Sequence, residues 1–260
     1  MCFERFYESW VDNLHRLIHQ LTTAYTRNTA AAAEQPNPNQ NPSQETHLLQ
    51  LINSVMTHYT EYYRVKSIAA NNNVLSVFSA PWISSLERSL RWIGGWRPTT
   101  VFHLIYTESS IHFESRIDDI LRGHSTGDLG DLTPTQLRRV SDLQCETVRE
   151  ENEINEELAE WQDSVSDMMK TLMEMESMAN TTTGTTASSN DGGDFIDGKI
   201  GRLAGVLERA DDLRLRTVRR VVDLLTPQQT VEFLIAAAEL QFGVRGWGVN
   251  HDRQRGNADH

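Results

Sequence analysis

The sequence predicts an all-α protein, a multi-helix bundle with long antiparallel helices. Apolar residues recur at three- and four-residue steps over most of the chain, the spacing that places them along one face of a helix. No segment alternates polar and apolar residues for long enough between turn signals to indicate a sheet. Proline and glycine stand at the boundaries of the periodic segments, so local signals and periodicity agree.

Composition excludes several classes of protein. The 260 residues suffice for one large domain, and a net charge of -12 argues against a surface built to bind nucleic-acid phosphates. No apolar run approaches the roughly 20 residues of a membrane helix, and residues 1–10 lack the apolar core of a signal peptide. Cys2 and Cys145 form no CxxC pair and are typical of free thiols in a reducing compartment. We therefore expect a protein of the nucleus and cytoplasm that binds neither nucleic acid directly nor a membrane.

The first half of the chain predicts two long helices separated by a linker. An amphipathic helix is expected over residues 3–27, and the prolines and asparagines of residues 28–46 predict a flexible insertion. Periodicity resumes over residues 48–68 and is stopped by three asparagines, which favour turns. A short helix is then expected over residues 74–78.

A tight corner between two helices is expected next. Ser84 and Glu87 have the spacing of a capping box, and the helix they begin is expected to end at Gly94, because glycine closes helices in a left-handed conformation. Pro98 suits the first turn of the following helix. An indole on each arm can bury enough area to set the crossing of two short helices. The structural signature of this corner consists of Trp92, Gly94, Gly95, Trp96, Arg97 and Pro98.

The second half predicts three further helices. Thr133 and Gln136 form a capping box before a long helix with a heptad-like apolar seam and strongly acidic outer faces. Residues 180–194 predict a second flexible insertion, and Thr226 with Gln229 repeats the capping pattern before the last helix. The seam consists of Ile154, Leu158, Trp161, Val165, Met168, Leu172 and Met175. We predict a single domain over residues 3–248, followed by a disordered tail over residues 249–260.

The sequence carries no positive sign of catalysis or of a bound metal. No nucleophile elbow, P-loop or zinc knuckle is present. His15 and His19 lie one helical turn apart, but no third ligand is apparent, and surface histidines are the preferred interpretation. The glutamates of residues 150–160 are interpreted as a solvated helix face, and the arginines of residues 214–220 as partners of intramolecular ion pairs. We predict that the protein is not an enzyme.

Several segments together resemble a known plant family, the Delay of Germination domain, which also forms the C-terminal half of TGA-type bZIP transcription factors. The resemblance extends from about residue 3 to residue 248, and the corner is its most specific element. The segments that carry it are "FERFYESWVDNLHRLIHQL", "HYTEYYRVKSIAA", "PWISSLERSLRWIGGWRPTTVFHLIY", "DLTPTQLRRVSDLQ" and "RLAGVLERADDLRLRTVRRVVDLLTPQQTVEFLIAAAELQ". Because no basic region or zipper precedes the domain, the chain resembles the stand-alone branch, linked to seed dormancy, seed maturation and abscisic-acid signalling.

The resemblance implies two functional features that can be compared residue by residue. A phosphatase-docking motif with an aromatic residue three positions before a tryptophan is matched by Tyr7 and Trp10, with Phe6 beside them, although Arg5 replaces an expected acid. A role of Trp10 in the core stays open beside docking. The haem-binding histidines of the family are replaced by Gln241 and Arg245, neither a good axial ligand, so we expect no haem and no other cofactor.

The main functional hypothesis is a non-enzymatic regulator that binds a clade A type 2C protein phosphatase through Phe6, Tyr7 and Trp10. The alternative is a transcription-associated adaptor that pairs with TGA-type factors through the long acidic helix and its seam, and homo-oligomerisation stays open. A third class, a carrier of a hydrophobic ligand between helices, rests only on the all-α architecture.

Overall fold

The structure is a computed structural model that describes residues 3–34, 42–115, 127–179 and 190–258. Within these residues it contains helices and no strand, which confirms the all-α prediction; an isolated bridge joins Trp92 and Gly95. The elements are α1 (Phe3–Glu34), α2 (Pro42–Ser79), α3 (Ser85–Ser89), α4 (Thr100–Ser115), the 3-10 helix η1 (Leu129–Asp131), α6 (Pro134–Ala179), α7 (Asn190–Leu224) and α8 (Pro227–Ala258).

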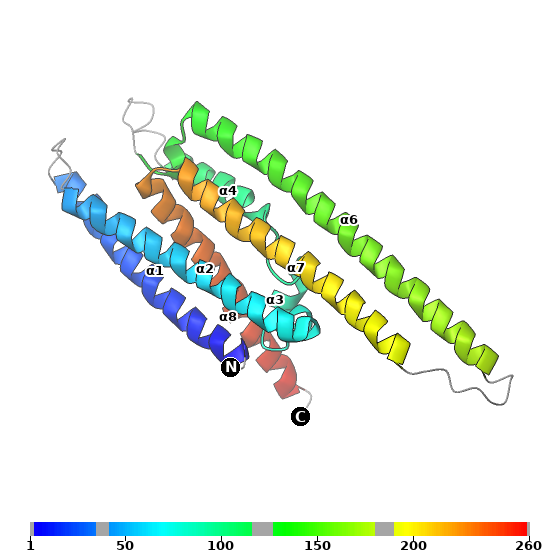
Figure 1. The fold of residues 1–260 in the computed structure, drawn as a ribbon. Helices are drawn as coiled ribbons and strands as arrows, with labels where there is room; N and C mark the ends of the chain where they lie inside the picture. The colour runs from blue at the N-terminus through cyan, green and yellow to red at the C-terminus, as the bar shows by residue number, and fades with distance from the viewer. Residues whose placement is uncertain (1–2, 35–41, 116–126, 180–189, 259–260) are drawn as a thin grey trace.

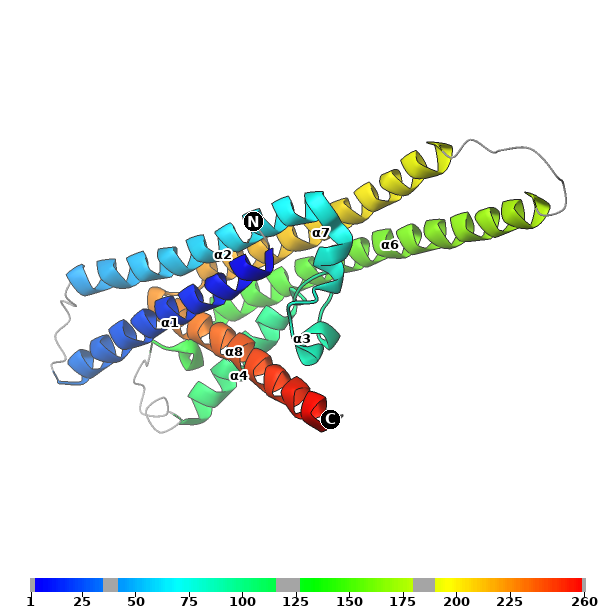
Figure 2. The same ribbon diagram turned by 90° about the horizontal axis from the view of Figure 1, so that it is seen from below.

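The long helices lie side by side in antiparallel pairs. Figure 1 shows α1 against α2 and α7 against α6, and α2 also packs on α7. α8 packs on α1, α3 and α4 and so ties the first half of the chain to the second. Figure 2 shows that the distal ends of α6 and α7 extend past the other helices as a projecting arm. We call this part, residues 162–179 and 190–199, the α6–α7 arm.

The apolar core lies where α1, α2, α4 and α8 meet, and two smaller clusters continue along α7 toward the arm. The main cluster contains Leu14, Leu21, Val55, Phe102, Ile105 and Phe233, all at most 1% exposed. The smaller clusters bring Leu207 and Ile154 together with the half-buried Leu158 and Trp161. The first part of the predicted α6 seam is therefore covered by α7 of the same chain.

The helices extend further than the sequence predicts. α1 continues through residues 28–34 and α2 begins at Pro42, so most of the predicted first insertion is helical; four consecutive alanines at 30–33 favour helix strongly. α7 includes residues 190–194, and residues 35–41 and 180–189 lie outside the described residues. Asn73 interrupts α2 with extended dihedral angles, and its side chain caps the next turn by accepting a hydrogen bond from the Ser76 amide.

Residues 249–258 of the predicted disordered tail are also helical, because α8 continues to Ala258, and residues 259–260 lie outside the described residues. A tertiary contact and a local one explain the extension: Asp252 accepts a hydrogen bond of 2.7 Å from the Ser85 amide at the start of α3, and the His251 ring stacks on Trp247 one turn earlier in α8. No helix in the part of the chain that the structure describes is long and apolar enough to cross a membrane.

Candidate functional site

The tryptophan corner is a short turn between α3 and α4. The Trp92 amide donates to the Gly95 carbonyl at 2.7 Å, and the Gly95 amide donates back to the Trp92 carbonyl at 3.1 Å. Ile93 and Gly94 between them have φ angles of 41° and 71°, as in a two-residue turn whose central residues are both left-handed. The capping box of Ser84 and Glu87 is present. The expected helix to Gly94 is wrong, because α3 ends at Ser89 and the turn forms its own hydrogen bonds.

Both glycines of the corner are required by close packing. A Cβ atom on Gly94 would lie 2.4 Å from Cδ1 of Leu207, at a φ angle that side chains rarely adopt. A Cβ atom on Gly95 would lie 2.8 Å from Cζ of Arg214. The turn therefore lies directly on α7, and the glycines permit its backbone to approach that helix.

Two buried cations of the neighbouring helices hold the backbone of the turn. The Arg214 guanidinium, fully buried on α7, donates to the carbonyls of Trp96 at 2.6 Å and Ile93 at 2.8 Å, and also to that of Trp92. Lys66 of α2 donates to the Gly94 carbonyl at 2.8 Å. Asp211 accepts from both side chains, at 2.7 Å from Lys66. Sequence reasoning missed both roles, although Lys66 continues an apolar stripe at helical spacing, where a charged residue is a signal of burial.

The two indoles and Arg97 of the signature anchor the corner to different helices. The Trp92 indole donates to Asn155 of α6 at 2.8 Å, and the Trp96 indole donates to the Tyr63 hydroxyl of α2 at 2.9 Å. Arg97 pairs with Glu151 at 2.7 Å, and the Glu151 side chain is fully buried. The interpretation of the acidic α6 run as a solvated face is therefore wrong for Glu151, because the α4 start packs over its carboxylate.

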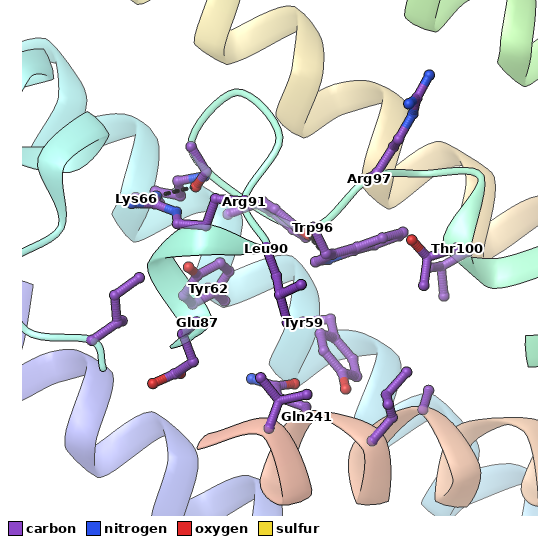
Figure 3. Close-up of a pocket in the computed structure, with 18 of the residues that line it drawn as sticks. Tyr59, Tyr62, Lys66, Glu87, Leu90, Arg91, Trp96, Arg97, Thr100 and Gln241 are labelled. Carbon is purple, nitrogen blue, oxygen red and sulfur yellow. Dashed lines mark hydrogen bonds between the residues drawn. The ribbon is translucent and has the colours of Figure 1, made fainter. Parts of the chain in front are cut away.

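A cavity of about 490 Å³ lies between α1, α2, the corner, α4, α7 and α8. Its walls are mainly aromatic and aliphatic; Figure 3 shows Tyr59, Leu90, Trp96 and Gln241 around a common space, with Lys66 and Arg91 beside the corner at one end. Burial, assisted by neighbouring arginines, lowers the pKa of Lys66 from its usual 10.5 to about 7. A small apolar molecule would fit this space.

The structure places Tyr7 and Trp10, two of the three predicted docking residues, at the wall of this cavity rather than on the surface. Tyr7 and Trp10 are 6% and 3% exposed, and Phe6 is half-buried against the core. The Trp10 indole donates to the His58 carbonyl at 3.0 Å and stacks on the His58 ring. Tyr7 donates to Glu87 at 3.2 Å, and burial together with that carboxylate raises its pKa to about 12. Of the two roles left open for Trp10, the structure shows the core role, because α1 turns this face inward onto α2; docking through Tyr7 and Trp10 stays a prediction.

The residues weighed for metal, haem and nucleic-acid binding have other surroundings. His15 stacks on Phe242, and no group of three metal-binding side chains occurs within the described ranges. Gln241 lines the cavity, and the Arg245 guanidinium lies 5.0 Å from the Tyr7 ring centre. The predicted intramolecular pairing of the basic patch is found, because Arg216 and Arg220 form ion pairs with glutamates of α6.

Known proteins are similar to this chain in sequence along most of its length. A family model described as seed dormancy control matches residues 17–107. Protein DOG1-like 4 of Arabidopsis thaliana is 30% identical over 246 residues, which cover 95% of this chain and 91% of that protein. The chain belongs to the DOG1-like family. Protein DOG1-like 2 of the same plant is 31% identical over 216 residues, which cover 80% of this chain and 78% of that relative.

The DOG1-like fold of this chain is shared with plant transcription factors. Transcription factor TGA2 of Arabidopsis thaliana is 23% identical over 236 residues, a match that covers 91% of this chain and 60% of TGA2. The predicted family is therefore confirmed, including the domain that it shares with TGA-type factors. The chain is a plant regulatory protein of the DOG1 type.

Proposed function

We propose that this DOG1-like chain is a non-enzymatic regulator of seed dormancy and abscisic-acid signalling that acts by binding a TGA-type bZIP factor in the nucleus. The observation that carries the proposal is the α6–α7 arm, on which Met169, Met173 and Ile196 expose 47%, 63% and 43% of their surface. Methionine side chains adapt to varied apolar partners. TGA2 matches nearly the whole of this chain, which supports pairing between two related helical domains.

The test is a pull-down of recombinant TGA2 by the wild type and by a Met169→Glu, Met173→Glu double variant. Loss of TGA2 from the double variant is the expected result, because two buried charges would oppose an apolar contact. Leu137→Glu is the matched control, since Leu137 is an exposed apolar residue at the other end of α6. Equal capture by all three proteins would contradict the proposal, and sedimentation of the wild type alone reports whether the arm pairs two copies.

The second candidate partner is a clade A type 2C protein phosphatase, which the spacing of Tyr7 and Trp10 supports. Because both side chains are buried, docking through them requires the first turns of α1 to leave the core. Their aromatic contacts with Tyr62, at ring distances of 6.4 and 4.8 Å, oppose this release. Glu4 and Glu8 already lie exposed on the outer face of α1.

Calorimetric titration of the phosphatase with wild type, Trp10→Ala and Glu8→Lys tests this candidate. Trp247→Ala is the control, because Trp247 is 61% exposed on α8 and distant in sequence from the motif. Weaker binding by Trp10→Ala or Glu8→Lys, at unchanged helix content and with the control unaffected, supports docking through α1. Binding that none of the changes weakens, or no binding by the wild type, argues against it.

The cavity favours a small-molecule role that is compatible with either partner. We propose that it holds a small apolar ligand, and we test this by native mass spectrometry and by the fluorescence of anilinonaphthalene sulfonate. Ala237 lines the cavity, so Ala237→Phe should reduce the bound probe. Ala236→Phe is the matched control on the neighbouring residue of α8, which is outside the lining. Equal probe binding by the two variants would exclude the cavity as the site.

A further inference from the structure

Lysine is rare in this chain, and one lysine is buried in its core. Among the 24 lysines and arginines, only Lys66, Lys170 and Lys199 are lysines. The Lys170 side chain is 72% exposed and Lys199 is half-buried, whereas the Lys66 side chain is 1% exposed. Buried ion pairs ordinarily use arginine, whose charge is permanent; lysine differs in being able to lose its proton. The chain thus has a titratable primary amine at the one core position where it uses lysine.

The charges around Lys66 favour the neutral amine. Arg214 already donates to Asp211, and Arg91 donates to the same Gly94 carbonyl as Lys66. Protonated Lys66 would make three buried or half-buried cations against one carboxylate, and loss of its proton relieves this excess. The two hydrogen bonds that Nζ donates, to Gly94 and Asp211, match the two N–H bonds of a neutral amine and leave its lone pair. The lowered pKa agrees with this charge balance.

The same amine forms part of the cavity wall. Lys66 lines the cavity together with Tyr62, Tyr63 and Trp96, and Figure 3 shows it beside Arg91 where the corner closes one end. A lysine that is desolvated in an apolar pocket and placed next to other cations is the environment in which lysine becomes a nucleophile toward carbonyl compounds. Lys170, by contrast, is exposed, pairs with Asp167 of its own helix and lies outside the cavity lining.

We propose that Lys66 forms an imine with an apolar aldehyde that enters the cavity. The inference rests on the proposed capacity of the cavity for apolar molecules, and it adds the chemical class of the ligand and the atom that binds it. An aldehyde held in this way would be retained far longer than one held by apolar contact alone.

The reaction balances with groups that are present. The Nζ lone pair forms a bond to the carbonyl carbon while the π pair of the C=O bond moves to oxygen. One N–H proton passes to that oxygen and gives a carbinolamine; the second follows when the oxygen leaves as water and the C=N bond forms. Asp211, with its carboxylate 2.7 Å from Nζ, can accept and return each proton. No oxidant or reductant takes part.

The experiment uses decanal as the probe and sodium cyanoborohydride to reduce any imine to a stable secondary amine. The full chain is treated at pH 7, and peptide mapping by mass spectrometry gives the labelled fraction at each of the three lysines. We expect the initial labelling rate of Lys66 to exceed those of Lys170 and Lys199 about tenfold or more, because a far larger fraction of Lys66 is neutral at this pH. Labelling of Lys66 at a rate equal to or below that of Lys170 and Lys199 would overturn the proposal.

Two variants and one binding control separate this inference from the proposed function. Lys170→Arg should leave the labelling of Lys66 unchanged, and Ala237→Phe should reduce it by filling the cavity. Fluorescence titration with anilinonaphthalene sulfonate is run in parallel on the wild type. Probe binding without labelling of Lys66 overturns the imine and retains the cavity, whereas absence of both overturns the two proposals together. Because labelling is measured on the wild type, the result does not depend on the folding of a Lys66 variant.

Discussion

Arg214 holds the backbone of the corner through hydrogen bonds, a role that its sequence context does not suggest. Its neighbours Arg216 and Arg220 pair at the surface with Glu150 and Glu146 of α6. Arg214 instead donates hydrogen bonds to the turn carbonyls of Trp92, Ile93 and Trp96. A buried charge of this kind is retained because its hydrogen bonds replace its hydration.

Replacing Arg214 by methionine is expected to lower the free energy of unfolding by about 3 kcal/mol or more, because it removes one of the two donors to Asp211 and the hydrogen bonds of Arg214 to the turn carbonyls. Urea denaturation followed by circular dichroism measures the change. Arg216→Met, on the same helix with a side chain 45% exposed, should cost less than about 1 kcal/mol. Equal losses in the two variants would show that Arg214 is no more than a surface residue in energetic effect.

Lys66 is expected to make stability depend on pH. The unfolded chain keeps its proton on Lys66 up to about pH 10.5, whereas the folded chain releases it near pH 7. Between these values the unfolded state binds more protons, so the free energy of unfolding rises with pH. The stability that Lys66 contributes by being neutral in the fold is fully present above pH 10.5, and it is lost as the pH falls toward 7.

The measurement is the difference in unfolding free energy between wild type and Lys66→Met at several pH values from 7 to 10, in which other titrating groups cancel. The free energy of unfolding of the wild type should increase relative to that of Lys66→Met as the pH rises. A difference that is constant, or that falls with pH, would show that Lys66 is charged in the fold.

At the scale of elements, capping residues connect helices as well as begin them. Thr133 and Gln136 cap α6, Thr226 and Gln229 cap α8, and the Gln136 side-chain amide donates to Gln229 at 2.7 Å. Gln229 is buried and donates in turn to the Asp128 carbonyl before η1. The two capping motifs are thus joined by hydrogen bonds that connect α6, α8 and the residue before η1.

Gln229→Leu should therefore lower the free energy of unfolding by about 1–3 kcal/mol, since it leaves buried donors and acceptors without partners. Thermal and urea unfolding measure the loss. Gln162→Leu is the control, because Gln162 is exposed on α6, and it should be nearly neutral. Similar effects of the two substitutions would contradict a shared cap.

Substitution of glycine by alanine should change stability in opposite directions in a helix and in the corner. Nothing lies within 4 Å of the position that a Cβ atom would take on Gly205 of α7, so Gly205→Ala should raise stability by about 0.5–1 kcal/mol. Gly95→Ala should lower it, because the new atom would meet Arg214 at 2.8 Å. Calorimetric melting temperatures decide the signs, and a stable Gly95→Ala variant would show that the turn can move away from α7.

At the scale of the whole molecule, the fold combines a compact body with the α6–α7 arm. In the described residues the apolar clusters reach Trp161 and Ile200 but include no α6 residue beyond them. A helix that packs no apolar face against the rest of the protein is stabilised only by weak interactions within the helix itself. Hydrogen exchange should therefore be faster for amides of residues 162–170 than for those of residues 140–158 in the same helix. Added TGA2 should slow it if the arm is the docking surface, whereas uniform protection along α6 would show that the arm is a rigid part of the body.

The sequence by itself determined the all-α class, the order of the helices, the three capping boxes and the family. These follow from spacing of three and four residues and from cap and turn chemistry, which are local and survive in any packing. The ends of the helices were predicted less well. Residues 28–34 look like a linker but continue α1, whose alanines favour helix. Residues 249–258 look like a tail but continue α8, which contacts α3 there.

Only the tertiary structure decided which faces of the helices are inside. Tyr7 and Trp10 have the same spacing whether they face a partner or α2, and the packing of α1 on α2 buries them. Glu151 is interpreted from the sequence as part of a solvated face, yet it is buried, as are Lys66 and Arg214, where α6, α2 and α7 meet the corner. The cavity has no local signature, because its wall is built from six segments of the chain that meet only in the folded state.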